Sequence, residues 1–397
     1  MTAGTHPTDR SHVDGAALDA ILQGAVDTGG VPHVAAIVAD RDGVIYDGAA
    51  GPRAVGEDGP LTTDTRFRLM SMTKMVATTA ALQQVEKGAL DLDAPVDTYC
   101  PQFADLQVLD GFDGDTPRLR PPASRATVRQ LMTHTAGLGY WFWNADLVRW
   151  HEVSGVPNVV AGLASSFTTP LVADPGTQFV YGFSTDWLGK VVEAVTGVGL
   201  DVAVKEGITG PLRMDRTTWQ REGDGLPDCT PVHVRGEDGT WTAVGEVLNQ
   251  EPEWWAGGHG LYAPPTDYIR FERALLRGGE LDGVRILEEA TVDAAFTNQI
   301  GDLDVPPLVP TADPGSSDDW RPGPGWKWGL GLLLNTDDQP GMRRAGSGAW
   351  AGLCNTQFWI DRTAGVCGSV YSNFLPFITP AALQVYEDVE KAVYARR

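Results

Sequence analysis

The sequence of 397 residues predicts an α+β protein whose antiparallel sheet is built from both ends of the chain. Two observations predict this class. β-like runs flank turn residues near the start, in residues 34–46, and again near the end, in residues 356–373. The stretch between these hairpins is rich in helices and loops. The length allows one large domain or two interleaved ones.

The first elements along the chain are a helix and a hairpin. Apolar side chains recur at helical spacing in residues 14–28, which predicts an amphipathic helix. Apolar runs at 34–38 and 44–46 flank turn residues and form the predicted hairpin. A long helix is expected over residues 71–88, with an apolar side and Gly88 at its end.

The middle of the chain is expected to hold short helices and long loops. Residues 90–125 and 302–326 are rich in Asp, Pro and Gly, and the second of them predicts an excursion near the mouth of a site. Helices are expected over residues 128–132 and 183–197. After the C-terminal hairpin, with its turn at 362–365, a closing helix ends the chain.

The composition limits the classes of partner and location. Thirty basic and 52 acidic residues give a formal charge of −22, which repels polyphosphates, so no nucleic-acid partner is expected. No apolar run approaches ~18 residues, so no membrane partner is expected. The first residues lack the apolar core of a signal peptide, which predicts a cytoplasmic protein unless an export signal has been removed. The oligomeric state stays open, with a homo-oligomer as one option.

No cofactor is expected, and several catalytic classes lack their signatures. The four cysteines are scattered without a CxxC pair, so no metal site is predicted. A GxSxG elbow, an HExxH motif and a P-loop are all missing from the sequence. His134, in the turn-like string THTAG, is therefore expected to be structural.

The first candidate for chemistry is the string SMTK at residues 71–74. Positions i and i+3 of a helix share a face, so Ser71 and Lys74 are expected to be neighbours. A serine hydroxyl needs a base, and lysine becomes one when burial removes its proton. The N–H groups at the start of the helix also stabilise negative charge that develops beside Ser71. A helix cap followed by a surface lysine is the alternative interpretation.

Two later segments contain residues suited to the same chemistry. Tyr181 precedes the helix at 183–197, and a nearby lysine lowers the pKa of a tyrosine so that it relays a proton. A half-buried core tyrosine is the alternative. Small residues in the segment 346–361 let a strand backbone approach a ligand, where a backbone N–H can complete an oxyanion hole. The alternative is a glycine-rich start of a strand without a functional role.

Taken together, these segments resemble the serine β-lactamase and penicillin-binding-protein superfamily. The likeness is closest to its class C-like branch, which includes family VIII carboxylesterases and lovastatin-type acyltransferases. SMTK is similar to the family's SxxK motif, Tyr181 falls at the place of its catalytic tyrosine in PGTQFVYGFSTDWLGKVVEAVTG, and Trp350-Ala351-Gly352 resembles the WGG motif of the esterases. The strings LMTHTAGL, LDLDAPV and GGHGLYAPPTDYIRF are also similar to family segments.

The resemblance implies a β-lactamase-like fold and a division of the chain. Residues 1–84 and 326–397 are expected to form an α/β domain, whose antiparallel sheet is flanked by the first and last helices. Residues 85–325 are expected to form a mostly helical inserted domain. The site then lies in the cleft between the two.

The resemblance also assigns roles within the site. Ser71 is the expected nucleophile, Lys74 and Tyr181 are the expected acid/base pair, and the backbone N–H groups of Ser71 and Leu353 form the expected oxyanion hole. Aromatic clusters beside Gly and Pro are typical of pocket walls. The expected substrate-binding residues are Tyr140, Trp141, Trp254, Trp255, His259, Trp350, Ala351 and Gly352.

Two departures from the β-lactamase pattern favour ester substrates. Gly182-Phe183 follows Tyr181 where β-lactamases of this type have Tyr-x-Asn, and Trp350 replaces the lysine of KTG. Both changes remove polar anchors for an anionic substrate and leave apolar surface. We therefore expect a carboxylesterase that cleaves uncharged, fairly hydrophobic esters through an acyl-enzyme on Ser71. The alternatives are an acyltransferase to an alcohol or amine, a β-lactamase or amide hydrolase, and a non-catalytic binding protein on the same fold.

Overall fold

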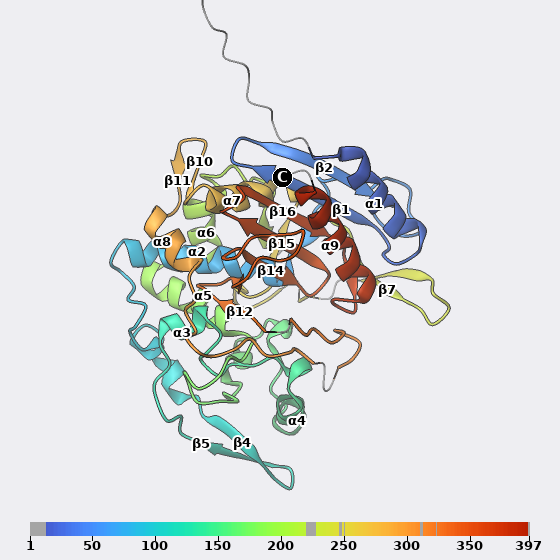
Figure 1. Ribbon diagram of the computed structural model, residues 1–397. Helices are drawn as coiled ribbons and strands as arrows, with labels where there is room; N and C mark the ends of the chain where they lie inside the picture. The colour runs from blue at the N-terminus through green and yellow to red at the C-terminus, as the bar shows by residue number, and fades with distance from the viewer. Residues whose placement is uncertain are drawn as a thin grey trace, which may run out of the picture.

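The structure is a computed structural model that describes residues 13–219, 228–245, 248–249, 251–309, 313–322 and 324–395. In this part of the chain, a seven-stranded sheet has the order β12-β13-β14-β15-β16-β1-β2, and every neighbouring pair is antiparallel (Figure 1). The predicted α+β class is therefore confirmed.

The sheet joins the two ends of the chain. Ala35 of β1 stands opposite Tyr371 of β16, so the N-terminal hairpin continues the C-terminal strands. The residues of these central strands are almost all buried, because helices cover both faces of the sheet. The strands of the sheet are β1 (Val34–Asp40), β2 (Val44–Ala50), β12 (Trp326–Trp328), β13 (Leu333–Asn335), β14 (Gly348–Gly352), β15 (Thr356–Asp361) and β16 (Val366–Tyr371).

The first and last helices cover one face of the sheet, as predicted. Helices α1 (Gly15–Asp27) and α9 (Pro380–Tyr394) contact each other and pack on the sheet through an apolar cluster of their own (Figure 1). The side chain of Asp14 caps α1 by accepting the N–H of Ala17. Helix α7 (Pro265–Leu276) lies against β1 and β16 and belongs to the larger cluster on the other side of the sheet. Because α7 comes from the middle segment, the division at residues 84 and 325 stays a prediction.

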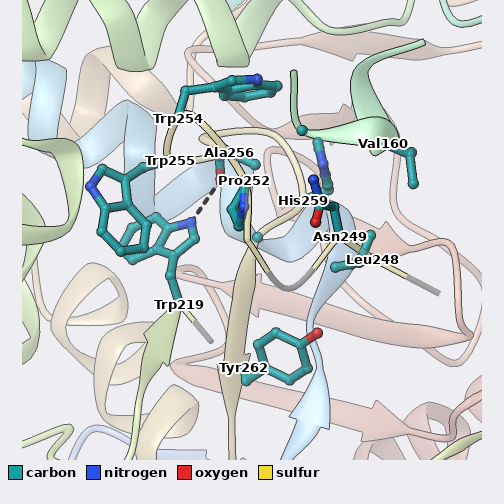
Figure 2. Close-up of a pocket in the computed structure, with 12 residues that line it drawn as sticks. Val160, Trp219, Leu248, Asn249, Pro252, Trp254, Trp255, Ala256, His259 and Tyr262 are labelled. Atoms are coloured by element: carbon teal, nitrogen blue, oxygen red, sulfur yellow. Dashed lines mark hydrogen bonds between the residues drawn. The ribbon is translucent and has the colours of Figure 1, made fainter. Parts of the chain in front are cut away.

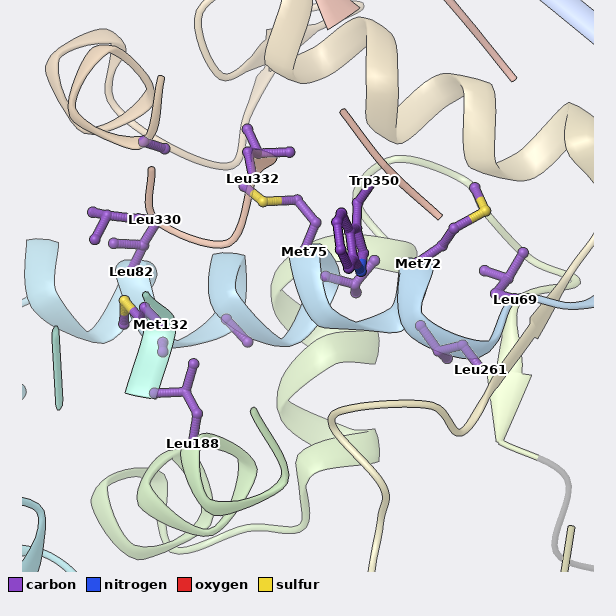
Figure 3. Packing of buried hydrophobic residues seen from close by; sticks show 14 of the residues in the cluster. Leu69, Met72, Met75, Leu82, Met132, Leu188, Leu261, Leu330, Leu332 and Trp350 are labelled. Atoms are coloured by element: carbon purple, nitrogen blue, oxygen red, sulfur yellow. The ribbon is translucent and has the colours of Figure 1, made fainter. Parts of the chain in front are cut away.

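Helix α2 (Thr73–Glu86) runs through the larger core, and a 3₁₀ turn at Met70–Met72 leads into it. The predicted helix is confirmed in place, but the expected single apolar side is wrong. Twelve of its 14 residues are buried, including threonines and alanines whose small side chains let neighbours approach from every side. Figure 3 shows Met75 and Leu332 packed above the helix and Leu188 below it.

The remaining helices surround α2 or lie further from the sheet. Helix α5 follows Tyr181 at the position predicted for residues 183–197 and packs against α2. Helix α3 matches the prediction for residues 128–132. These helices are α3 (Val128–Met132), α4 (Ala145–Ser154), α5 (Ser184–Thr196), α6 (Leu200–Val204), which continues into a π-helical turn at Lys205–Thr209, and α8 (Glu289–Ala295). Further 3₁₀ turns are Val96–Thr98, Pro101–Asp105, Trp141–Trp143, Val159–Ala161 and Ala164–Thr168.

Short strands account for the other regular structure. The expectation of a mostly irregular segment at residues 90–125 is incomplete, because a hairpin of β4 and β5 projects from the body there (Figure 1). Its strands are mostly exposed or half-buried, so they lack the apolar alternation that identifies a strand in a sequence. The short strands are β3 (Phe67–Arg68), β4 (Val108–Asp113), β5 (Thr116–Arg120), β6 (Thr218–Trp219), β7 (Val232–Arg235), β8 (Trp241–Val244), β9 (Leu261–Ala263), β10 (Glu280–Leu281), β11 (Val284–Arg285) and β17 (Phe374–Leu375).

None of the helices within the described ranges has both the length and the apolar character needed to cross a bilayer.

Candidate active site

Ser71 lies in the 3₁₀ turn directly before α2, at the positive end of the helix. Strand β14 lies against this turn, and its last residue has to be a glycine. A Cβ on Gly352 would come within 2.2 Å of the Leu69 carbonyl oxygen and 3.0 Å of the Met70 Cβ. Met70 itself has φ of +46°, a strained conformation for a side chain of its size. The serine is thus held on a tight turn between a helix and a strand.

Lys74 is buried one helical turn beyond the serine, as predicted. Its Nζ is 3.0 Å from Ser71 Oγ, 3.0 Å from the Tyr140 hydroxyl and 2.9 Å from the Gly258 carbonyl oxygen. Burial lowers the pKa of Lys74 to about 7, although the charge of Asp186 opposes this shift. A carbonyl can only accept, so Gly258 always holds one N–H of the amine. When the amine is neutral, its lone pair is available to take the proton of Ser71.

Tyr181 reaches the same point from the loop before α5. Its side chain hydrogen-bonds with that of Ser71, and its oxygen accepts the indole N–H of Trp350 at 2.8 Å. The Gly182 that follows is required, because a Cβ there would lie 2.1 Å from the Leu138 carbonyl oxygen. The expectation that the lysine lowers the pKa of Tyr181 is wrong. Burial raises this pKa, so the phenol stays protonated and acts as a proton donor at neutral pH.

The structure adds a second tyrosine to this cluster. Tyr140 was expected only as a pocket wall, but its hydroxyl accepts a hydrogen bond from Lys74, and burial raises its pKa well above the usual value. The Lys74 Nζ lies 5.1 Å from the centre of the Tyr140 ring and 4.9 Å from that of Tyr181. The ring centre of His134 is 4.6 Å from that of Tyr181, and burial holds its pKa well below the usual range, which fits the structural role expected for it.

A cavity of about 140 Å³ opens at Ser71. Most of the residues around it are aromatic or aliphatic, and in the described part of the lining none is a lysine or arginine. Six of the predicted site residues besides Ser71 and Tyr181 line this cavity: Tyr140, Trp141, His259, Trp350, Ala351 and Leu353. The lining also includes residues that were not predicted: Met70, Phe142, Trp143, Val160, Leu248, Ser316, Cys354, Leu375 and Phe377. The oxyanion role of the Ser71 and Leu353 N–H groups stays a prediction.

Three predicted substrate-binding residues lie outside this lining. Trp254 and Trp255 line a smaller adjoining cavity of about 30 Å³, with room for roughly one or two water molecules (Figure 2). The two cavities share His259, Val160 and Leu248. Gly352 also lines neither cavity but supports the turn that holds Ser71. Sequence clustering identified these tryptophans as aromatic walls, yet it could not separate two neighbouring cavities.

The arrangement contains the parts needed for acyl transfer to a serine. A hydroxyl, a buried amine and two protonated phenols meet within hydrogen-bond distance at the end of an apolar cavity. In the described ranges no cluster of three or more His, Cys, Asp or Glu side chains is suited to hold a metal ion.

These features, on a sheet made from both chain ends, define a serine enzyme of the β-lactamase and penicillin-binding-protein superfamily. Residues 18–392 match the model of the family described as Beta-lactamase, and the chain belongs to that family. The predicted recognition and the β-lactamase-like fold are both confirmed.

Relatives within the family include an esterase and acyltransferases. The chain is 32% identical to a lovastatin esterase of Penicillium rubens over 88% of this chain and 91% of that protein. It is 30% identical to a monacolin J acid methylbutanoyltransferase of Aspergillus terreus over 96% of this chain and 95% of that protein. The LovD6 mutant of the Aspergillus terreus simvastatin synthase superposes with a TM-score of 0.81 at 31% identity, covering 95% of this chain and 94% of that one. These relatives support an enzymatic role for the chain.

Proposed function

We propose that the protein is a carboxylesterase that cleaves uncharged, fairly hydrophobic esters through an acyl-enzyme on Ser71. The observation that carries this proposal is the set of contacts at Ser71. The lysine amine lies 3.0 Å from the serine oxygen, and the tyrosine hydroxyl bonds to the same side chain. The relationship to a lovastatin esterase supports hydrolysis as the reaction.

The proposed reaction begins with proton transfer inside the buried cluster. Neutral Lys74 takes the Ser71 proton while the serine oxygen attacks the ester carbonyl. Backbone N–H groups at Ser71 and Leu353 stabilise the tetrahedral oxyanion. Tyr181 donates its proton to the departing alcohol and recovers one from Lys74. Water then attacks the acyl-enzyme by the same steps, which releases the acid and restores Ser71.

The cavity supports a neutral, apolar substrate over an anionic one. Trp350 occupies the position of the lysine that β-lactamases use, and its indole N–H is already bound to Tyr181. Because the described lining holds no cationic side chain, an anionic β-lactam would lose water without gaining a charged partner. This argues against the β-lactamase alternative. The buried, preorganised lysine argues against a non-catalytic binding role.

The test compares hydrolysis of neutral aryl esters of short acids by the protein and three variants. Ser71→Ala should abolish turnover, and Lys74→Ala and Tyr181→Phe should each lower kcat/KM by at least ~10²-fold, since each removes a proton-transfer group. Ser166→Ala is the matched control, because Ser166 is also buried but bonds to Asn158 outside the site. Unchanged rates in any of the three site variants would contradict the proposal.

Acyl transfer is the second candidate, favoured by the 30% identity to a methylbutanoyltransferase. The same acyl-enzyme serves both reactions, and the acceptor in the cavity decides between them. Supplying a bulky secondary alcohol with the aryl ester tests this. An esterase releases free acid whatever the alcohol concentration, whereas a transferase forms a new ester at the expense of the acid. The cytoplasmic location expected from the N-terminal sequence stays a prediction.

A further inference from the structure

A buried carboxylate lies behind the catalytic lysine, and nothing in the proposed reaction uses it. Asp186 is on the first turn of α5, five residues after Tyr181, and is completely buried. Its Oδ1 accepts the N–H of Gly258 at 2.7 Å. Its Oδ2 is buried and has no hydrogen-bond partner among the described residues. An unpaired buried carboxylate oxygen is costly, so its retention calls for a functional reason.

Gly258 connects this carboxylate to the lysine. Its N–H binds Asp186, and its carbonyl oxygen accepts from Lys74 Nζ at 2.9 Å. A Cβ on Gly258 would lie 2.7 Å from Asp186 Oδ2 and 2.9 Å from Oδ1, so the carboxylate rests directly on the Cα of the glycine. A Cβ on Gly257 would lie 2.6 Å from the carbonyl oxygen of Thr185. The glycine pair therefore fits closely against the start of α5.

The charges around Lys74 also point to Asp186. The titratable groups that face the amine are Tyr140, Tyr181, His134, His259 and Asp186. Burial raises the pKa of both tyrosines and lowers the pKa of both histidines, to about 3 for His259, so these four are neutral at pH 7. Burial raises the pKa of Asp186 to about 6, while Lys74 and the Gly258 N–H oppose this shift, so the carboxylate is the group among these five that carries charge at pH 7.

We propose that Asp186 is a positioning residue for Lys74. It holds the lysine beside Ser71 through the backbone of Gly258, and its negative charge helps the amine to retain its proton. This inference rests on the proposed function. Burial alone would lower the pKa of the amine further, and an amine of lower pKa is a weaker base toward Ser71. The carboxylate raises the pKa of the amine again, so that the lysine changes its charge close to neutral pH.

Two substitutions separate the positioning effect from the charge effect. Asp186→Asn keeps an oxygen for the Gly258 N–H but removes the charge, so the acid limb of kcat/KM should move to lower pH by about one unit. Asp186→Ala removes the anchor as well, so kcat should fall about tenfold or more at every pH while KM changes little. An unmoved acid limb in Asp186→Asn, or wild-type kcat in Asp186→Ala, would overturn the proposal.

Further variants guard against a loss of folding. Gly258→Ala leaves Asp186 in place in the sequence, but the added methyl group pushes its carboxylate away from the backbone of residue 258. This variant should also move the acid limb of kcat/KM to lower pH. Asp361→Asn is the matched control, because Asp361 is likewise buried and accepts a backbone N–H, from Arg344, outside the site. Its pH profile should match that of the wild type. An acid limb that moves as far in this control would show a general effect of removing buried charge and defeat the proposal.

A titration that does not depend on activity distinguishes this inference from the proposed function. With ¹³C-labelled lysine, the Cε resonance of Lys74 is assigned by its loss in Lys74→Arg and followed against pH. Its midpoint should be lower in Asp186→Asn than in the wild type, whether or not any ester is cleaved. Equal midpoints would overturn the electrostatic part of the proposal, while failure of Ser71 to react with a fluorophosphonate would overturn the proposed function alone.

Discussion

At the scale of single residues, the site works through hydrogen bonds that fix proton positions. The Trp350 indole donates to the Tyr181 oxygen at 2.8 Å, which occupies one lone pair of the phenol. The phenol proton and the second lone pair of the Tyr181 oxygen then point toward Ser71. A proton has to be donated to the leaving group at that place. The tryptophan therefore has a role beyond that of an apolar wall.

Trp350→Phe tests this role. The substitution keeps an aromatic ring in the cavity but removes the N–H, so we expect kcat to fall roughly tenfold with little change in KM. Trp141→Phe is the comparison, because Trp141 lines the same cavity. Unlike the indole of Trp350, its indole does not donate a hydrogen bond to Tyr181. It should affect KM more than kcat. Equal effects of both variants on kcat would show that the indole acts only by its bulk.

The sequence alone points to the three residues that meet at the candidate site, because SxxK is a local pattern and Tyr181 stands in a recognisable frame. Their catalytic roles stay a prediction. The contacts that tune them are not local. Lys74 is separated from Tyr140 by 66 positions and from Gly258 by 184, and only the fold brings them together. The pKa of Tyr181 was predicted in the wrong direction for a related reason. The family resemblance places a lysine beside this tyrosine, but the sequence does not show how completely the phenol is buried.

At the scale of elements, the important contact is that of β14 with the turn before α2. The strand runs from Gly348 to Gly352 and ends where a side chain would collide with the Leu69 carbonyl oxygen at 2.2 Å. The hairpins, α1, α3, α5 and α9 were all predicted from periodicity and turn residues. The exposed hairpin of β4 and β5 and the all-round burial of α2 were not, because each departs from the usual amphipathic pattern.

Gly352→Ala tests the contact between β14 and the nucleophile turn. The added methyl group has to displace the backbone at Leu69, so we expect a loss of ~10²-fold or more in kcat/KM, because the serine leaves its position between helix and strand. Gly43→Ala serves as the control, since a Cβ there meets nothing within 4 Å. Wild-type activity in the folded Gly352→Ala variant would mean that the close approach of the strand does not position Ser71.

At the scale of the whole molecule, buried neutral histidines join distant parts of the chain. His33, just before β1, bonds to the Pro52 carbonyl and to Thr230, and its ring meets that of His233 edge-on at 4.8 Å. Burial lowers the pKa of His33 to about 3. The unfolded chain therefore binds a proton below pH 6.5 that the folded chain binds only near pH 3, so stability falls as the pH drops through this window.

His33→Gln should weaken that dependence on acid. The amide keeps polar contacts but does not titrate, so the loss of stability between pH 6.5 and pH 4 should be smaller than in the wild type, even if the variant is less stable at pH 7. Denaturant unfolding at several pH values measures this. His151→Gln is a suitable comparison, because its ring is only partly buried. An identical decline in wild type and His33→Gln would show that other groups control acid unfolding.

The proposed reaction requires that Ser71 becomes covalently acylated. The most direct measurement is the intact mass of the protein after brief reaction with a neutral aryl ester and rapid quenching in acid, followed by peptide mapping. We expect a mass increase equal to one acyl group, located on the peptide that contains Ser71 and lost in Ser71→Ala. Ester cleavage without any adduct at Ser71, or an adduct that persists in Ser71→Ala, would contradict it.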